Sequence, residues 1–416
     1  MRSVIVIMLL FLIPLFNAYP SAIRPDDPPY SPELIAHLEA IQAQVSDIRQ
    51  LPILTTNWGF FLSRASLQHD LAHSHYPSDI NDTLNAFYLA FDFIPDQIDF
   101  VTLNLEVQSD YLDGYYDSLT GNFFIVLDEA DAPSYPLTKR EQITYAHEFV
   151  HVLQRQHFEI YNIPTHHLPR DASQAIRAFI EGEASFVEQK FARQNNLPPY
   201  DYQAIAEELN YPAIFIAEHE LVYLEGATFI RHLYQVGGWE QINQVYQRLP
   251  DASHHILYPD RYLTEHPLYD VPITQVAIVF ADPLAWRIME EDQLGAFFLR
   301  EYLATQLPYD VIKPILADWT GDRYILYQNF KTNQLAWVLN TAWQTAEATQ
   351  QFYDLYHTFA EARSGQIASE QPNNIYCWAA PDRVLCLKGN GQAHVTLSNA
   401  PTLQEAVDMI VLQSIR

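Results

Sequence analysis

Positive charge is scarce in this sequence. Its 416 residues include 23 Lys and Arg against 51 Asp and Glu, which gives a net charge of −28. A surface with that charge repels the phosphates of nucleic acids and the headgroups of anionic lipids. We therefore expect no nucleic acid and no anionic membrane surface as a partner. The acidity suits a soluble secreted protein.

Cysteine is almost absent. The only two, Cys377 and Cys386, lie in short apolar segments on either side of a Pro-Asp turn at residues 381–382. In an exported chain this pattern favours a β-hairpin closed by a disulfide. A pair of buried free thiols is the alternative, and in both cases the expected role is structural rather than catalytic.

Long hydrophobic runs are missing beyond the N-terminus. The one apolar run covers residues 4–16 and is interrupted by Pro14. A membrane span needs about 20 apolar residues, so this run is too short for one but has the length of a signal-peptide core. We expect a signal peptide at residues 1–18 and a Pro-rich linker at residues 19–30. The mature protein would then be secreted or extracytoplasmic, without a stable membrane span.

An H-E-x-x-H sequence occupies residues 147–151, shortly after a T-x-x-E capping box at residues 138–141 that should begin a helix. On a helix, His147 and His151 lie on one face, so both imidazoles can bind one metal ion. Glu148 lies about 100° further round the helix, where its carboxylate can reach a water held by that ion. The pattern is typical of zinc hydrolases.

Two histidines are an incomplete site, because a catalytic zinc takes three protein ligands and keeps one position open. The next predicted helix begins near residues 171–173 and carries Glu181, one loop and half a helix after His151. That separation is enough to bring Glu181 beside the histidines, and Gly182 leaves room there. Glu225, which is also followed by a glycine, is the competing third ligand.

Together these two runs resemble the gluzincin metallopeptidases, whose third ligand lies in an Asn/Gln-Glu-Gly-x-Ala helix. The gap between the runs is more similar to that of the bacterial collagenases than to that of thermolysin. The resemblance implies Zn²⁺ as the cofactor, His147, His151 and Glu181 as its ligands, and Glu148 as the general base. Ile180 replaces the usual amide, and the G-x-M-E-N stretch of aminopeptidases is absent, so an endopeptidase is favoured.

Gluzincins also use a Tyr or His donor to stabilise the oxyanion of the tetrahedral intermediate. We predict Tyr223 for this role, because it begins a helix downstream of the ligand helix. His254 and Tyr262 are alternatives, and Tyr223 could equally be a packing residue. The runs around these residues resemble a group of uncharacterised secreted bacterial proteins that also carry H-E-x-x-H.

Two segments ahead of the motif helix are rich in β-branched and aromatic residues, at 100–107 and 121–127. They predict two strands joined by a turn. In zinc peptidases the strand just before the motif helix often forms the edge of the cleft and pairs with an extended substrate. We therefore expect residues 122–127 to offer such an edge.

The expected fold class is α+β. Residues 31–282 should form a mainly helical, zincin-like catalytic domain with a small sheet, and residues 283–416 a smaller α+β domain without a second metal site. In the latter we expect helices at 294–303, 344–363 and 403–411, strands at 319–327 and 335–339, and a turn with a local ion pair at 321–323.

These features predict a secreted zinc metallopeptidase that acts on a peptide or protein substrate. One alternative is a zinc-binding or surface-interaction protein on a peptidase scaffold that has no activity. Another is a zinc hydrolase that cleaves bonds other than peptide bonds. The cleavage preference and the oligomeric state are left open by the sequence.

Overall fold

The computed structural model describes residues 30–73, 78–128, 132–160, 168–198, 211–264, 268–389 and 393–413. The predicted signal peptide, and all of the predicted linker except Tyr30, lie outside these residues. Within them, no helix combines the length and the apolar content that a membrane crossing requires.

The chain forms two compact units, each assembled from separate stretches of sequence. The first unit contains Met1–Pro77, Val101–Leu168 and Ile176–Pro250, and the second contains Ser78–Phe100, Pro169–Ala175 and Asp251–Arg416. From the sequence we expected a single boundary after residue 282. The observed division differs, in part because helix α3 (Ser78–Ala90) packs on the large sheet of the second unit. The predicted α+β class is confirmed.

The first unit holds a three-stranded sheet of β1 (Phe60–Ser63), β2 (Gly114–Asp117) and β3 (Asn122–Leu127). Its order is β1-β3-β2, with β1 parallel and β2 antiparallel to β3. The strand predicted at residues 122–127 is therefore present, but both of its edges are paired, so the prediction that it offers a free edge is wrong. Among the described residues, β2 pairs only with β3 and forms one end of the sheet.

The segment predicted as a strand at residues 100–107 is a helix, α4 (Phe100–Tyr111). Its buried side chains recur with helical spacing, at Phe100, Val101, Asn104, Val107 and Gln108. That spacing places them on one face of a helix, whereas a strand would bury alternate residues. Because the segment is rich in valine, threonine and phenylalanine, we predicted the two-residue period of a strand instead of the period of a helix.

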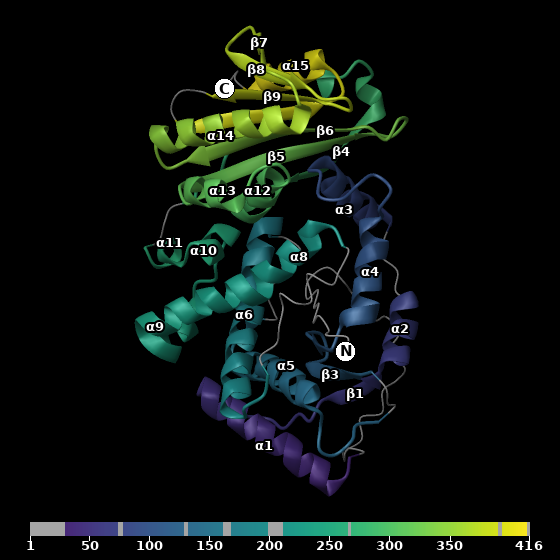
Figure 1. The fold of residues 1–416 in the computed structure, drawn as a ribbon, viewed down its shortest axis with the longest axis vertical. Coiled ribbons are helices and arrows are strands. Elements are labelled where there is room, and N and C mark those ends of the chain that lie inside the picture. Colours follow the sequence, from purple (N-terminus) through teal and green to yellow (C-terminus); the bar gives the residue numbers. More distant parts are fainter. Residues whose placement is uncertain are drawn as a thin grey trace. The chain divides into compact units, whose positions relative to one another are not determined.

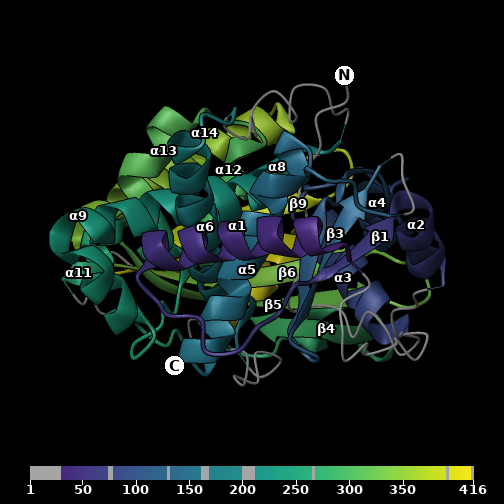
Figure 2. The same ribbon diagram turned by 90° about the horizontal axis from the view of Figure 1, so that it is seen from below.

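Helix α5 (Lys139–His157) carries the H-E-x-x-H motif and begins where the capping box predicts. Thr138 Oγ1 accepts a hydrogen bond from the Glu141 backbone N–H at 3.2 Å, and Glu141 Oε2 accepts one from the Thr138 N–H at 2.7 Å. This capping box satisfies backbone donors that would otherwise lack a partner. Helix α1 (Pro32–Arg49), which Ser31 caps, lies across α5 (Figure 2).

Helix α6 (Arg170–Gln194) carries Glu181 and is shared by the two units, since it begins in the second and continues in the first. Three helical segments follow one another without a break: α8 (Ala213–His219), the π-helical η3 (Glu220–Glu225) and α9 (Gly226–Val245). Figure 1 shows this long helical stretch beside α6.

The second unit is built on a seven-stranded sheet, whose neighbouring strands are all antiparallel, in the order β4-β5-β6-β10-β9-β8-β7. The strands are β4 (Trp286–Asp292), β5 (Trp319–Asn329), β6 (Leu335–Trp343), β7 (Ser369–Gln371), β8 (Ile375–Ala379), β9 (Val384–Gly389) and β10 (His394–Ala400). The strands predicted at residues 319–327 and 335–339 are confirmed.

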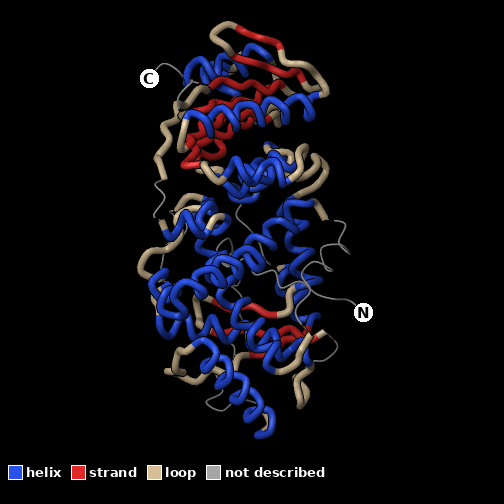
Figure 3. The backbone as a smooth tube through the Cα atoms, turned by 60° about the vertical axis from the view of Figure 1, so that its left-hand side comes forward, coloured by secondary structure: helices blue, strands red, loops and turns tan. Residues whose placement is uncertain are grey.

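Helices cover both faces of this sheet (Figure 3). On one face, Tyr302 of α12 (Gly295–Ala304) packs against Trp337 of β6, with the ring centroids 5.7 Å apart. On the same face, Phe352 of α14 (Ala346–Ser364) stacks on Trp343. On the other face, Met409 of α15 (Leu403–Gln413) packs among residues that alternate with these along the strands. All three helices were predicted.

The other helices within the described residues are α2 (Arg64–Ala72), α10 (Ser253–Leu257), α11 (Pro259–Leu263), α13 (Tyr309–Leu316) and the short 3₁₀ turns η4 (Ala277–Val279) and η5 (Pro283–Ala285).

Two local predictions in the second unit have opposite outcomes. Cys377 and Cys386 face each other across the β8-β9 hairpin and form the predicted disulfide. The turn predicted at residues 321–323 is wrong, because these residues lie inside strand β5. There the buried Asp322 carboxylate accepts hydrogen bonds from the backbone N–H groups of Leu294 and Gly295, at 2.7 and 3.0 Å.

Candidate metal centre

Three side chains meet in the first unit as a group that can hold a metal ion: His147, His151 and Glu181. One ligand atom from each lies within 4.8 Å of the others, and all three side chains are buried. Glu181 Oε2 is 3.2 Å from His147 Nε2 and 3.4 Å from His151 Nε2. No other such group of three occurs among the described residues.

The two imidazole rings are held through their other nitrogens. His147 Nδ1 is 2.9 Å from Glu188 Oε2, and His151 Nδ1 is 2.8 Å from Gln154 Oε1. Gln154 is itself fixed, since its Nε2 donates to the Ile180 carbonyl at 3.0 Å. If Nδ1 carries the proton in each ring, the Nε2 lone pairs of both rings point toward the Glu181 carboxylate. Metal-binding histidines use the same arrangement.

Charge attraction within this buried group perturbs the titration of its members. Burial would lower the pKa of His147, but its hydrogen bonds to Glu181 and Glu188 raise that pKa to about 10. Burial would raise the pKa of Glu181, but the two histidines hold it well below its usual range. The protein therefore favours a carboxylate, rather than a carboxylic acid, at the third ligand position.

Glu148 is fully buried, and neither of its carboxylate oxygens has a hydrogen-bond partner among the described residues. Burial raises the pKa of Glu148 to about 7. Strand β2 passes close by: a Cβ atom on Gly114 would lie only 3.0 Å from Glu148 Oε1 and 2.7 Å from Thr144 Cγ2. Gly114 thus lets the backbone of β2 approach the face of α5 that carries Glu148.

Tyr223 lies beside His147, with their ring centroids 6.0 Å apart, and is fully buried. It belongs to the π-helical turn η3, a departure from α-helical geometry that is frequent at functional sites. A contact between two glycines brings this turn close to α6. A Cβ on Gly182 would lie 2.2 Å from the carbonyl carbon of Gly226, so neither helix can carry a side chain at the crossing.

The residues considered as alternatives to Glu181 and Tyr223 have different surroundings. Glu225 is not a member of the metal-binding group, although it lies in the same π-helical turn as Tyr223. His254 and Tyr262 belong to the second unit. There, His254 Nε2 lies 3.1 Å from the carbonyl oxygen of Ala317, and Tyr262 packs on His255.

Glu188 and Gln154 were missed by the sequence analysis, although helical spacing points to both. Gln154 follows His151 by three residues on the same helix, and Glu188 lies two turns after Glu181 on α6. A search for polar residues at these spacings from the predicted ligands would have found them.

Replacing Glu188 by Gln should lower the affinity for the metal by roughly 10- to 100-fold, the usual cost of losing a carboxylate behind a metal-binding histidine. The amide retains a hydrogen-bond acceptor for His147 but removes the charge that makes the imidazole more basic. Competition with a chromogenic chelator measures the affinity. Glu159→Gln, an exposed acid beyond the end of α5, serves as the control. Unchanged affinity in Glu188→Gln would show that the contact does not support the ligand.

One family model matches part of the second unit. Residues 284–410 match a family described as "Domain of unknown function (DUF8575)". This stretch covers less than half of the chain and does not include His147, His151 or Glu181. No curated protein and no solved structure matches the chain.

Proposed function

We propose that this protein is a secreted zinc metallopeptidase, with an endopeptidase activity of the gluzincin type and a zincin-like arrangement of the first unit. One observation carries the proposal: three buried metal-binding side chains converge, and a fourth acid, Glu148, lies beside them without a hydrogen-bond partner among the described residues. The predicted signal peptide supports export.

The donor set fits a catalytic zinc better than a structural one. Two imidazoles and one carboxylate are the ligands of many zinc hydrolases, whereas structural zinc sites are closed by four protein ligands. Glu181 Oε1 also lacks a hydrogen-bond partner among the described residues, although it is buried. A buried carboxylate oxygen without a partner is costly, and a bound cation would remove that cost.

A zinc ion bound here would acidify a water molecule and polarise the scissile carbonyl. The protein's own residues would supply the rest. Glu148 would take a proton and pass it to the leaving amine, since it is the acid on the same face that is not needed as a ligand. Tyr223, beside His147, would donate a hydrogen bond to the developing oxyanion.

Strand β2 is suited to align the substrate. It lies next to α5, it forms one end of the sheet among the described residues, and Gly114 keeps its backbone close to Glu148. An extended peptide could add to that edge through main-chain hydrogen bonds, which place successive side chains without requiring one sequence. The substrate-binding strand is thus β2 rather than β3.

Metal analysis joined to a proteolysis assay tests the proposal. The purified protein should hold about one zinc per chain, as a three-ligand site does. It should cleave casein, lose that activity to a chelator and regain it with added zinc. The His151→Ala variant should lose both zinc and cleavage. Zinc without cleavage of casein or of peptide libraries would favour a binding protein or a hydrolase of other bonds. Absence of zinc would contradict both the peptidase and the hydrolase of other bonds.

A further inference from the structure

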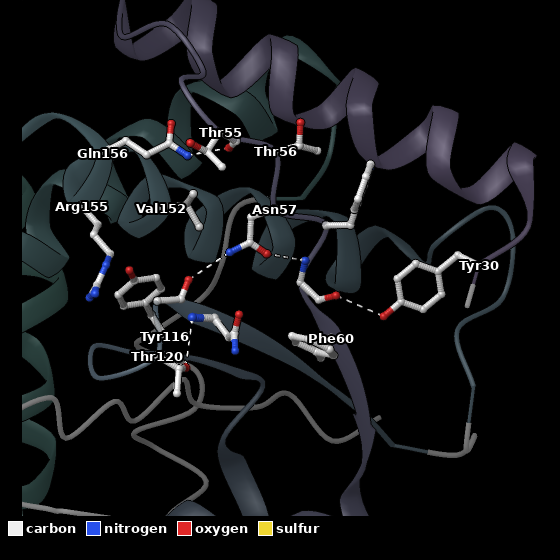
Figure 4. Close-up of a pocket in the computed structure, with 14 residues that line it drawn as sticks. Tyr30, Thr55, Thr56, Asn57, Phe60, Tyr116, Thr120, Val152, Arg155 and Gln156 are labelled. Carbon is white, nitrogen blue, oxygen red and sulfur yellow. Dashed lines mark hydrogen bonds between the residues drawn. The ribbon is translucent and has the colours of Figure 1, made fainter. Parts of the chain in front are cut away.

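A pocket of about 470 Å³ lies in the first unit (Figure 4). Its lining comes from the segment that leads into β1, the β2-β3 hairpin and the C-terminal half of α5, together with Tyr30. The volume is typical of ligand pockets and exceeds what a single side chain fills. None of its lining residues is a predicted ligand or catalytic group.

The charge of this pocket is opposite to that of the chain as a whole. Among the residues that the structure describes, no Asp or Glu lines it, and Arg155 is its only charged lining residue. The remaining polar lining is neutral and includes Asn57, Thr120 and Asn122. In a protein with a net charge of −28, a pocket with a lone cation and no acid in its wall favours an anionic ligand.

Arg155 is held in place without an acidic partner. Its Nη1 donates to the backbone carbonyl of Ser118, and its side chain also hydrogen-bonds to Tyr116. It forms no ion pair with any described residue. Gly121 makes room for it, because a Cβ there would lie 3.0 Å from Arg155 Nε. The guanidinium is therefore oriented in advance, while no described acidic residue neutralises its charge.

The pocket wall is also formed in advance. Asn57 Nδ2 donates to the Gly121 carbonyl and Asn57 Oδ1 accepts from the Gly59 N–H, both at 3.0 Å. Gln156 accepts from the Leu54 N–H and donates to the Thr55 carbonyl. Because these amides are engaged with the backbone on both sides, the wall needs little rearrangement to receive a ligand.

Tyr116 connects the pocket to the metal centre. Its side chain lines the pocket beside Arg155 (Figure 4). Its ring centroid is 5.7 Å from that of His151. Tyr116 belongs to β2, the strand proposed to align the substrate, and lies two residues after Gly114, on the same face of the strand. A peptide on the β2 edge would reach the pocket within a few residues of the scissile bond.

We propose that this pocket binds a carboxylate of the substrate peptide, held by Arg155, so that the enzyme prefers peptides with an acidic group on the His151 side of the scissile bond. This inference rests on the proposed peptidase function. The carboxylate can belong to an Asp or Glu side chain or to the C-terminus of the peptide. Both sources present the planar pair of oxygens that a guanidinium binds in a fork.

A randomised octapeptide library tests this pocket by two readouts, cleavage by the parent and retention on immobilised Glu148→Gln protein. In the parent, Asp and Glu should be enriched at one position by about tenfold, the size expected of a charge-assisted hydrogen bond. Arg155→Gln should lose the enrichment, and Arg155→Glu should reverse it toward Lys and Arg. Arg193→Glu, an exposed arginine on α6, should behave as the parent.

Libraries with free and amidated C-termini distinguish the two sources of the carboxylate. Loss of the preference on amidation assigns it to the peptide terminus, and its persistence assigns it to a side chain.

Bound zinc and the circular dichroism spectrum of each variant report on folding. Cleavage without an acidic preference, or with one that Arg155→Glu leaves unchanged, overturns this inference alone. Retention of acidic peptides without cleavage supports the pocket and contradicts the peptidase. Neither cleavage nor retention overturns both.

Discussion

The Glu148→Gln variant should bind zinc as the parent does and lose cleavage by roughly a thousandfold, within the range that a positioned general acid and base contributes. Glu148 is not a member of the ligand group, so the amide leaves the three metal ligands in place. Glutamine has nearly the same shape as glutamate but cannot accept a proton at neutral pH. The measurements are zinc content by mass spectrometry and the rate of casein cleavage.

The control for this variant is Glu159→Gln, which removes one exposed acid in the same unit and should retain full activity. If Glu148→Gln cleaves casein as fast as the parent, Glu148 is not the base and the proposed mechanism is wrong. If it loses zinc as well as activity, Glu148 supports the metal centre and the loss of cleavage says nothing about proton transfer.

The local parts of the metal centre could be predicted from sequence because they depend on helical periodicity. The spacing of His147 and His151 and the capping box before them determine where two imidazoles lie on α5. Glu181 required one further inference, that a catalytic zinc needs a third ligand. The structure brings these three side chains together.

The non-local parts of the fold could not be predicted in the same way. Propensity alone favoured a strand at residues 100–107, whereas the tertiary environment buries one helical face of α4. The order β1-β3-β2 depends on β1, a strand of four residues that the sequence analysis did not identify. Without β1, the strand β3 appeared to have an open edge.

The support for the ligands and the helix crossing depend on residues that are far apart in the sequence. Glu188 of α6 contacts His147 of α5, and Gly182 of α6 packs closely against Gly226 of α9. A single sequence shows each residue but not its partner. The prediction that Gly182 leaves room beside Glu181 was therefore incomplete, because the room is filled by the backbone of the helix that carries Tyr223.

Replacing Gly182 by Ala should lower both the metal affinity and the stability of the first unit, although alanine favours a helix over glycine by about 1 kcal/mol. The added Cβ would lie 2.2 Å from a backbone carbon of Gly226, a contact that cannot exist without moving one helix. Overpacking of this kind costs about 1–3 kcal/mol. The movement would also displace Glu181, the neighbouring residue, from His147 and His151.

Gly226→Ala should have the same effect, because its Cβ would lie 2.2 Å from the Ala178 carbonyl oxygen at the same crossing, although Gly226 is remote from the ligands in sequence. Arg193→Ala, on the exposed face of α6, is the control for a change in helix propensity alone. Thermal unfolding and chelator competition measure the two quantities. A Gly182→Ala protein that is more stable than the parent and binds zinc equally well would show that helix propensity outweighs the contact. In that case the close crossing would not position Glu181.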